Sequence, residues 1–169
     1  IIRNDPMWMD GNYALDQEPK EGMRLARKLG MISYRSPEEW DERFGRDMLP
    51  CKDCQDHRPF KPEFQIESYL ESTAQKFVGT FDANSYIYLS RAMDWFDLAD
   101  HNERLIALAE ECVVKKALVI GVETDVLFPI HQQRCVADLL TESGLDVTFA
   151  ELPSLQGHDA FLIDRANFN

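Results

Sequence analysis

Two polar side chains follow predicted strands at positions where they could form a catalytic pair. His158 stands in the stretch QGHDAF (156–161), shortly after the alternating run 146–152, and Asp125 follows the apolar run 117–122. They are 33 positions apart, about one strand–helix–strand step, and parallel strands bring such positions to the same edge of a sheet. An aspartate that orients a histidine supplies two members of a nucleophilic triad. The alternatives are a helix-capping His158 and a turn-forming Asp125.

A second candidate for chemistry is the pair Cys51 and Cys54, which His57 follows after two further residues. A structural zinc site needs four ligands, usually from two such knuckles, and no second knuckle is found in the sequence. A redox motif would open a helix after a strand, but prolines on both sides indicate a loop. We therefore predict a reduced surface loop and no metal site.

Composition excludes several classes of function. The 169 residues carry 30 acidic and 18 basic side chains, a formal charge of -12. Nucleic-acid binding needs a basic surface, so we expect no nucleic-acid partner. The longest apolar run, 117–122, is too short to span a bilayer, and no leader is evident. We expect a soluble cytoplasmic protein that has no membrane partner.

Residues 1–100 have the periodicity of helices joined by polar loops. Apolar residues at helical spacing predict helices over 22–33, 66–78 and 82–98. Ser36 as cap, Pro37 at the first helical position and Glu39 three residues after the cap predict another helix, which runs to about Phe44 and ends at Gly45. The simplest account of the stripe formed by Tyr86, Leu89, Met93 and Phe96 is core packing.

Beyond residue 100 the pattern changes to alternating strands and helices. Helices are predicted over 103–112 and 129–143, the latter closed by Gly144, and a further helix near His158. The run 117–122 is typical of a buried parallel strand, and 146–152 of a second strand. This order predicts a parallel sheet at the end of an α/β domain.

These segments resemble a known family. ETDVLFPIHQQ (123–133) and LQGHDAFLID (155–164) are similar to the acid and histidine segments of the homoserine O-acetyltransferase family, which has the α/β-hydrolase fold. DPMWMDGNY (5–13), GMRLARKLGMISYRS (22–36) and the region 64–99 extend the resemblance over nearly the whole chain. It implies a helical lid region over 1–100 and the C-terminal part of the α/β-hydrolase domain over 101–169.

The nucleophile of that fold sits in a G-x-S-x-G elbow, which precedes the acid and the histidine in the chain. None of the serines here has that setting, so we expect a fragment whose nucleophile lies before residue 1. The remainder of the same enzyme is then a partner of this chain, which alone would be inactive.

The resemblance also implies an activity and a set of site residues. The implied reaction transfers acetyl from acetyl-CoA, a substrate and not a bound cofactor, to the L-homoserine hydroxyl through a serine acyl-enzyme in methionine biosynthesis. His158 and Asp125 match the catalytic positions, Arg27 the arginine that binds the substrate carboxylate, and Asp159 the position that holds the substrate ammonium. The lid is also the implied homodimer contact.

Three alternatives to this activity stay open. A relative that uses succinyl-CoA, or serine in place of homoserine, would have much the same sequence. An esterase would use the same fold and triad but pass the acyl group to water. A lid and dimerisation module would have no activity of its own.

Overall fold

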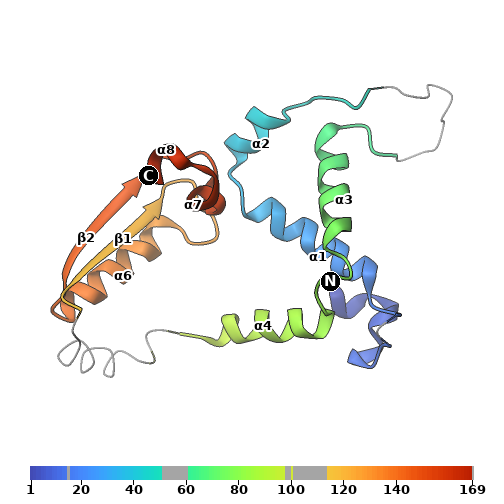
Figure 1. The fold of residues 1–169 in the computed structure, drawn as a ribbon, viewed down its shortest axis with the longest axis horizontal. Helices are drawn as coiled ribbons and strands as arrows, with labels where there is room; N and C mark the ends of the chain where they lie inside the picture. Colours follow the sequence, from blue (N-terminus) through green and yellow to red (C-terminus); the bar gives the residue numbers. More distant parts are fainter. Residues whose placement is uncertain (15, 51–60, 98–99, 101–113, 169) are drawn as a thin grey trace. The chain divides into compact units, whose positions relative to one another are not determined.

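The structure is a computed structural model that describes residues 1–14, 16–50, 61–97, 100 and 114–168 (Figure 1). It divides into two compact units. The first unit comprises Ile1–Ile32 and Trp40–Asp94, and the second comprises Ser33–Glu39 and Trp95–Asn169. Seven residues of the predicted lid region, Ser33–Glu39, therefore group with the C-terminal residues.

The first unit consists of helices, as the apolar periodicity predicts. Its longer elements are α1 (Lys20–Ser33), α3 (Gln65–Phe77) and α4 (Ala83–Trp95), preceded by the 3-10 turns η1 (Ile2–Asn4) and η2 (Pro6–Gly11). Its core is built on Ile2, Met23 and Ala83, against which side chains of η2, α1, α3 and α4 pack. Burial of these apolar groups on α1 and α4 holds the helices together.

Asp5 joins the N-terminal turns to α1. One of its carboxylate oxygens accepts from the backbone N–H of Met7 at 2.9 Å, and the other accepts from that of Gly22 at 2.7 Å. A Cβ on Gly22 would lie 2.9 Å from the Ile2 Cα, so the turn can reach the helix only where the side chain is absent. One side chain therefore satisfies two backbone donors that would otherwise lack partners.

The helix α2 (Pro37–Arg43) begins as the capping pattern predicts. The Ser36 hydroxyl accepts from the Glu39 backbone N–H at 3.0 Å, and Pro37 occupies the first helical position. Gly45, shortly after the helix, has φ +46, a conformation suited to a residue without a Cβ.

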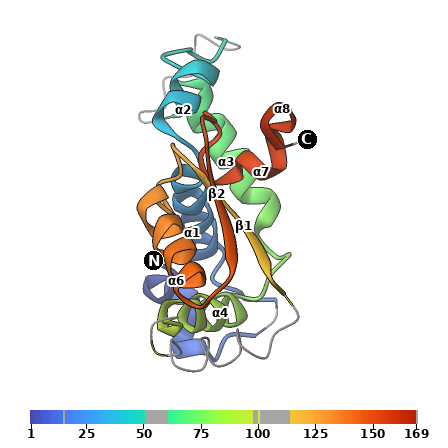
Figure 2. The same ribbon diagram turned by 90° about the vertical axis from the view of Figure 1, so that its left-hand side faces the viewer.

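The second unit contains a two-stranded parallel sheet. β1 (Lys116–Val122) pairs with β2 (Asp146–Leu152) in continuous register, from Lys116 opposite Asp146 to Val122 opposite Leu152. The helix α6 (Ile130–Glu142) connects the strands and contacts both of them (Figures 1 and 2). Gly144, at φ +86, follows the end of α6. The short elements η4 (Gly157–Asp159), α7 (Ala160–Ile163) and α8 (Arg165–Phe168) follow β2.

The helix α6 covers one face of the sheet. A Cβ on Gly121 would lie 3.1 Å from the Ile130 Cγ1, and Arg134 pairs with Glu151, so odd-numbered positions of β1 and β2 face the helix. The even-numbered positions point the other way, because side chains alternate along a strand. Leu118 on that face is 63% exposed. The prediction of a buried strand over 117–122 is therefore not met among the described residues, in which only one face of β1 is covered.

The core assignment of the α4 stripe is also wrong in part. Tyr86 packs against the core of the first unit, but Leu89, Met93 and Phe96 are 56%, 71% and 65% exposed. Periodicity identified the helix, but it does not say whether a neighbour covers the stripe. The predicted helix over 103–112 and the loop with Cys51, Cys54 and His57 lie outside the described residues. Within the described residues, no helix is long and apolar enough to cross a membrane.

Candidate catalytic site

The acid and the histidine emerge at the same edge of the sheet. Asp125 follows the carboxyl end of β1, and His158 follows the neighbouring end of β2. The backbone N–H of Glu123 donates to the Leu152 carbonyl at 3.2 Å, so pairing continues just beyond the strands. The His158 Nδ1 lies 2.9 Å from the Asp125 Oδ2. The contact expected from the spacing of the two residues is therefore present.

The Asp125 carboxylate is fixed by the loop that follows it. Its Oδ1 accepts from the backbone N–H groups of Leu127 and Phe128, each at 2.9 Å, while Oδ2 faces the imidazole. The side chain is only 10% exposed. A carboxylate held in this way favours the tautomer in which Nδ1 carries a proton, which leaves Nε2 to accept one.

Aromatic rings surround the imidazole. The His158 ring centroid lies 5.0 Å from that of Phe128, 5.6 Å from that of Tyr34 and 6.3 Å from that of Phe161. A hollow of about 140 Å³ adjoins the pair and is lined by Ile120, Val122, Asp125, Phe128, Gln133, His158, Phe161 and Phe168. Apolar walls beside a polar pair limit the access of water and strengthen electrostatic interactions there.

The turn before His158 is tied to the loop that carries Asp125. The Thr124 hydroxyl donates to the Ser154 carbonyl at 2.5 Å and accepts from the Gly157 backbone N–H at 3.2 Å. The Ser154 hydroxyl in turn donates to the Gln156 side chain at 2.6 Å. A single hydroxyl thus links the two strand ends, and the acid and the histidine are held relative to each other by their backbones.

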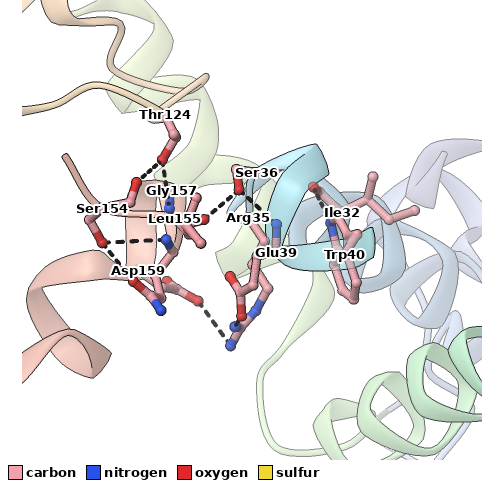
Figure 3. A network of polar contacts seen from close by, with 11 residues as sticks. Ile32, Arg35, Ser36, Glu39, Trp40, Thr124, Ser154, Leu155, Gly157 and Asp159 are labelled. Atoms are coloured by element: carbon pink, nitrogen blue, oxygen red, sulfur yellow. Dashed lines mark hydrogen bonds and ion pairs between the residues drawn. The ribbon is translucent and has the colours of Figure 1, made fainter. Parts of the chain in front are cut away.

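The Ser33–Glu39 segment, more than a hundred residues earlier in the chain, braces the same turn (Figure 3). The fully buried Ser36 donates its hydroxyl to the Leu155 carbonyl, and the Asp159 backbone N–H donates to the Tyr34 carbonyl at 3.4 Å. Gly157 has φ +61, and a Cβ there would lie 2.9 Å from the Ser36 backbone nitrogen. The turn can rest on this segment because residue 157 is glycine.

Sequence reasoning missed this brace. The local pattern predicts Ser36 only as a helix cap, whereas in the structure Ser36 caps α2 and also donates its hydroxyl to the Leu155 carbonyl. The available signal was the glycine directly before His158, since a glycine beside a functional residue often marks close backbone approach.

The two predicted substrate-binding residues lie in different units. Arg27, on α1 in the first unit, is half-buried with its guanidinium carbon 4.9 Å from the Phe77 ring centroid. Asp159, in the second unit, lies with Oδ2 3.6 Å from an Arg35 guanidinium nitrogen. Arg35 also bonds to Glu39, and Figure 3 shows the three side chains together. The roles assigned to Arg27 and Asp159 stay predictions.

In the described part of the chain, no group of three His, Cys, Asp or Glu side chains could hold a metal ion. Cys135 is a free, exposed thiol on α6. The His158–Asp125 pair is therefore the arrangement in these residues that is best suited to chemistry, and the chemistry it suits is proton transfer to and from a nucleophile.

Comparison with curated proteins finds relatives that match almost the whole chain. A serine O-succinyltransferase of Litchfieldella anticariensis is 52% identical over 99% of this chain, and one of Stenotrophomonas maltophilia is 54% identical over the same share. One of Xylella fastidiosa is 53% identical. The chain spans just under half the length of these relatives, 45–46%. No family model matches the chain.

Solved structures show the fold. A homoserine O-acetyltransferase from Bacillus anthracis superposes with a TM-score of 0.79 over 99% of this chain and 43% of its own, at 23% identity. The esterase E22 superposes with a TM-score of 0.74 over 98% of this chain and 44% of its own, also at 23% identity. The α/β-hydrolase fold predicted from the sequence is confirmed. The relatives are acyltransferases, which supports the acyltransferase class and leaves the predicted acetyl group open.

Proposed function

We propose that this chain forms the C-terminal part of an O-acyltransferase that moves an acyl group from a coenzyme A thioester to the hydroxyl of an amino acid. The observation that carries the proposal is the His158–Asp125 pair, at 2.9 Å, in a chain more than half identical to serine O-succinyltransferases. The pair alone would suit any acyl transfer, and the identity favours an amino-acid acceptor over water.

The geometry supports a two-step reaction. His158 Nε2 takes the proton of a serine hydroxyl from the rest of the enzyme, and that oxygen attacks the thioester carbonyl. The carbon–sulfur bond breaks, coenzyme A leaves as the thiol with the proton from His158, and an acyl-enzyme ester remains. The acceptor hydroxyl then loses its proton to Nε2 and attacks the ester, which releases the O-acyl amino acid and restores the serine. Asp125 stabilises the imidazolium formed in both steps.

Two substrate pairs are candidates for this reaction. The names of the relatives favour succinyl transfer to serine, while the sequence motifs favoured acetyl transfer to homoserine. In either case the acceptor is a zwitterion. Arg27 is the proposed contact of its carboxylate, since a guanidinium donates two parallel hydrogen bonds, and Asp159 is the proposed contact of its ammonium.

The full-length enzyme tests the proposal when each of acetyl-CoA and succinyl-CoA is combined with L-serine, L-homoserine or water. We expect a burst of free thiol without an acceptor, and steady turnover only with an amino acid. The pair with the highest kcat/KM identifies the substrates. Equal rates of thiol release with and without amino acids would show a hydrolase instead. If neither acetyl-CoA nor succinyl-CoA gives a burst, the proposal is refuted.

A further inference from the structure

The Glu39 carboxylate is buried and only half satisfied. The residue is 9% exposed, its Oε1 bonds to Arg35, and its Oε2 has no hydrogen-bond partner among the described residues. A buried oxygen without a partner costs stability, more so when it is charged. The position in the first turn of α2 does not explain the acid, because the exposed neighbour Glu38 complements the helix dipole equally well.

Arg35 is shared unequally between Glu39 and Asp159. One guanidinium nitrogen bonds directly to Glu39, whereas the other lies 3.6 Å from the Asp159 Oδ2, longer than a charge-assisted hydrogen bond. All three side chains are mostly buried, at 12–22% exposure, so solvent screens them weakly. Two carboxylates share one guanidinium, and Asp159, which has the longer contact with Arg35, is the less neutralised of the two.

This distribution of charge matters because Asp159 follows His158 directly. If Glu39 did not engage Arg35, the guanidinium would be free to make a two-pronged contact with Asp159 and cancel its charge. The bond to Glu39 holds Arg35 back, and Asp159 stays oriented without being neutralised. A cationic group can then still bind to it.

We propose that Glu39 is a specificity-determining residue that acts through Arg35, keeping Asp159 able to bind the ammonium group of the acceptor. This inference rests on the proposed function, in which Asp159 contacts that ammonium. Glu39 itself touches no substrate and is a positioning residue.

The test is Glu39→Gln in the full-length enzyme, because glutamine keeps the size of the side chain but can offer Arg35 only a weaker, neutral hydrogen bond, which lets the guanidinium turn to Asp159. KM for the amino-acid acceptor should rise roughly five- to thirtyfold, while the burst of thiol release and the thermal midpoint stay close to the parent values. Glu38→Gln is the matched control, since it removes the same charge at the neighbouring position, which is exposed. It should leave KM unchanged.

A second readout separates charge from fold. The hydroxy acid that matches the acceptor but lacks its amino group should react equally well with the parent and with Glu39→Gln. Glu39→Asp, which keeps the charge, should retain more of the preference for the amino acid than Glu39→Gln does. Equal losses on both acceptors, or equal behaviour of the two Glu39 variants, would overturn the inference. If the parent enzyme shows no burst, the proposed function itself has failed.

Discussion

Gly157→Ala is the change whose consequence the structure defines most sharply. The alanine Cβ would lie 2.9 Å from the Ser36 nitrogen, 3.0 Å from the Tyr34 oxygen and 3.1 Å from the Arg35 carbonyl carbon. All three are backbone atoms, so no side-chain rotation can relieve the contact. Either the turn before His158 or the Ser33–Glu39 segment must move.

The expected loss of stability has two parts. An L-residue at the positive φ of position 157, +61, costs about 1–2 kcal/mol, and overpacking in a close contact typically costs a further ~1–3 kcal/mol. We therefore expect the free energy of unfolding to fall by about 2–5 kcal/mol. Because His158 follows directly, a displaced turn should also lower kcat roughly tenfold to a hundredfold.

The matched control is Gly144→Ala in the same unit. Gly144 has φ +86, but nothing lies within 4 Å of the position that its Cβ would occupy. It should lose only the backbone term, about 1–2 kcal/mol, and keep the parent kcat. Urea unfolding with linear extrapolation measures the first quantity and acyl transfer the second. Equal losses of unfolding free energy in the two variants, or a normal kcat in Gly157→Ala, would refute the claim that close packing on the Ser33–Glu39 segment positions the turn before His158.

Three further predictions concern single side chains. Asp125→Asn should keep the fold, since an amide oxygen can still accept from the loop, but its NH2 would face His158 and impose the wrong tautomer. The kcat should therefore fall by roughly 10⁴, and a near-normal kcat would remove Asp125 from the mechanism. Arg27→Ala should spare the thiol burst and lower kcat/KM for the acceptor about thirtyfold or more, and an equal defect on an acceptor without a carboxylate would assign Arg27 to the fold. The Tyr13 hydroxyl donates to the Asp82 carboxylate at 2.5 Å and lowers the pKa of that carboxyl. The ionised Asp82 therefore stabilises the fold above about pH 4, and this contribution is lost as the pH falls through the pKa of Asp82 in the folded protein. In Tyr13→Phe the urea unfolding midpoint should therefore fall less steeply with decreasing pH below about pH 4 than in the parent. The same pH dependence in both proteins would contradict this linkage.

The elements of this chain could be predicted from local patterns. Ser36 and Pro37 marked the start of a helix because capping chemistry acts within four residues. The apolar and alternating runs gave β1 and β2, and their spacing placed Asp125 beside His158 because parallel strands end at one edge. Each inference uses interactions that are local, or that one strand–helix–strand step fixes.

What covers each element could not be predicted in the same way. Leu89 and Met93 have helical spacing whether or not a neighbour packs on them, and they are exposed here. The hydrogen bond from Ser36 to Leu155 joins residues 119 positions apart, and neither residue type predicts it. The salt bridge of Arg35 to Asp159 could not be predicted either, because it depends on tertiary placement.

The path of the chain between its two units limits how this protein can be recombined. The Ser33–Glu39 segment is encoded within the helical half, yet it packs on the turn of Gly157 in the other. A chimera with a crossover near residue 95 would take the segment from one parent and the turn from the other. If the parents differ at Ser36, Arg35 or Glu39, the segment of one parent would then pack on a turn whose sequence comes from the other parent. Exchanges between relatives should therefore be tolerated only where both pieces come from the same parent.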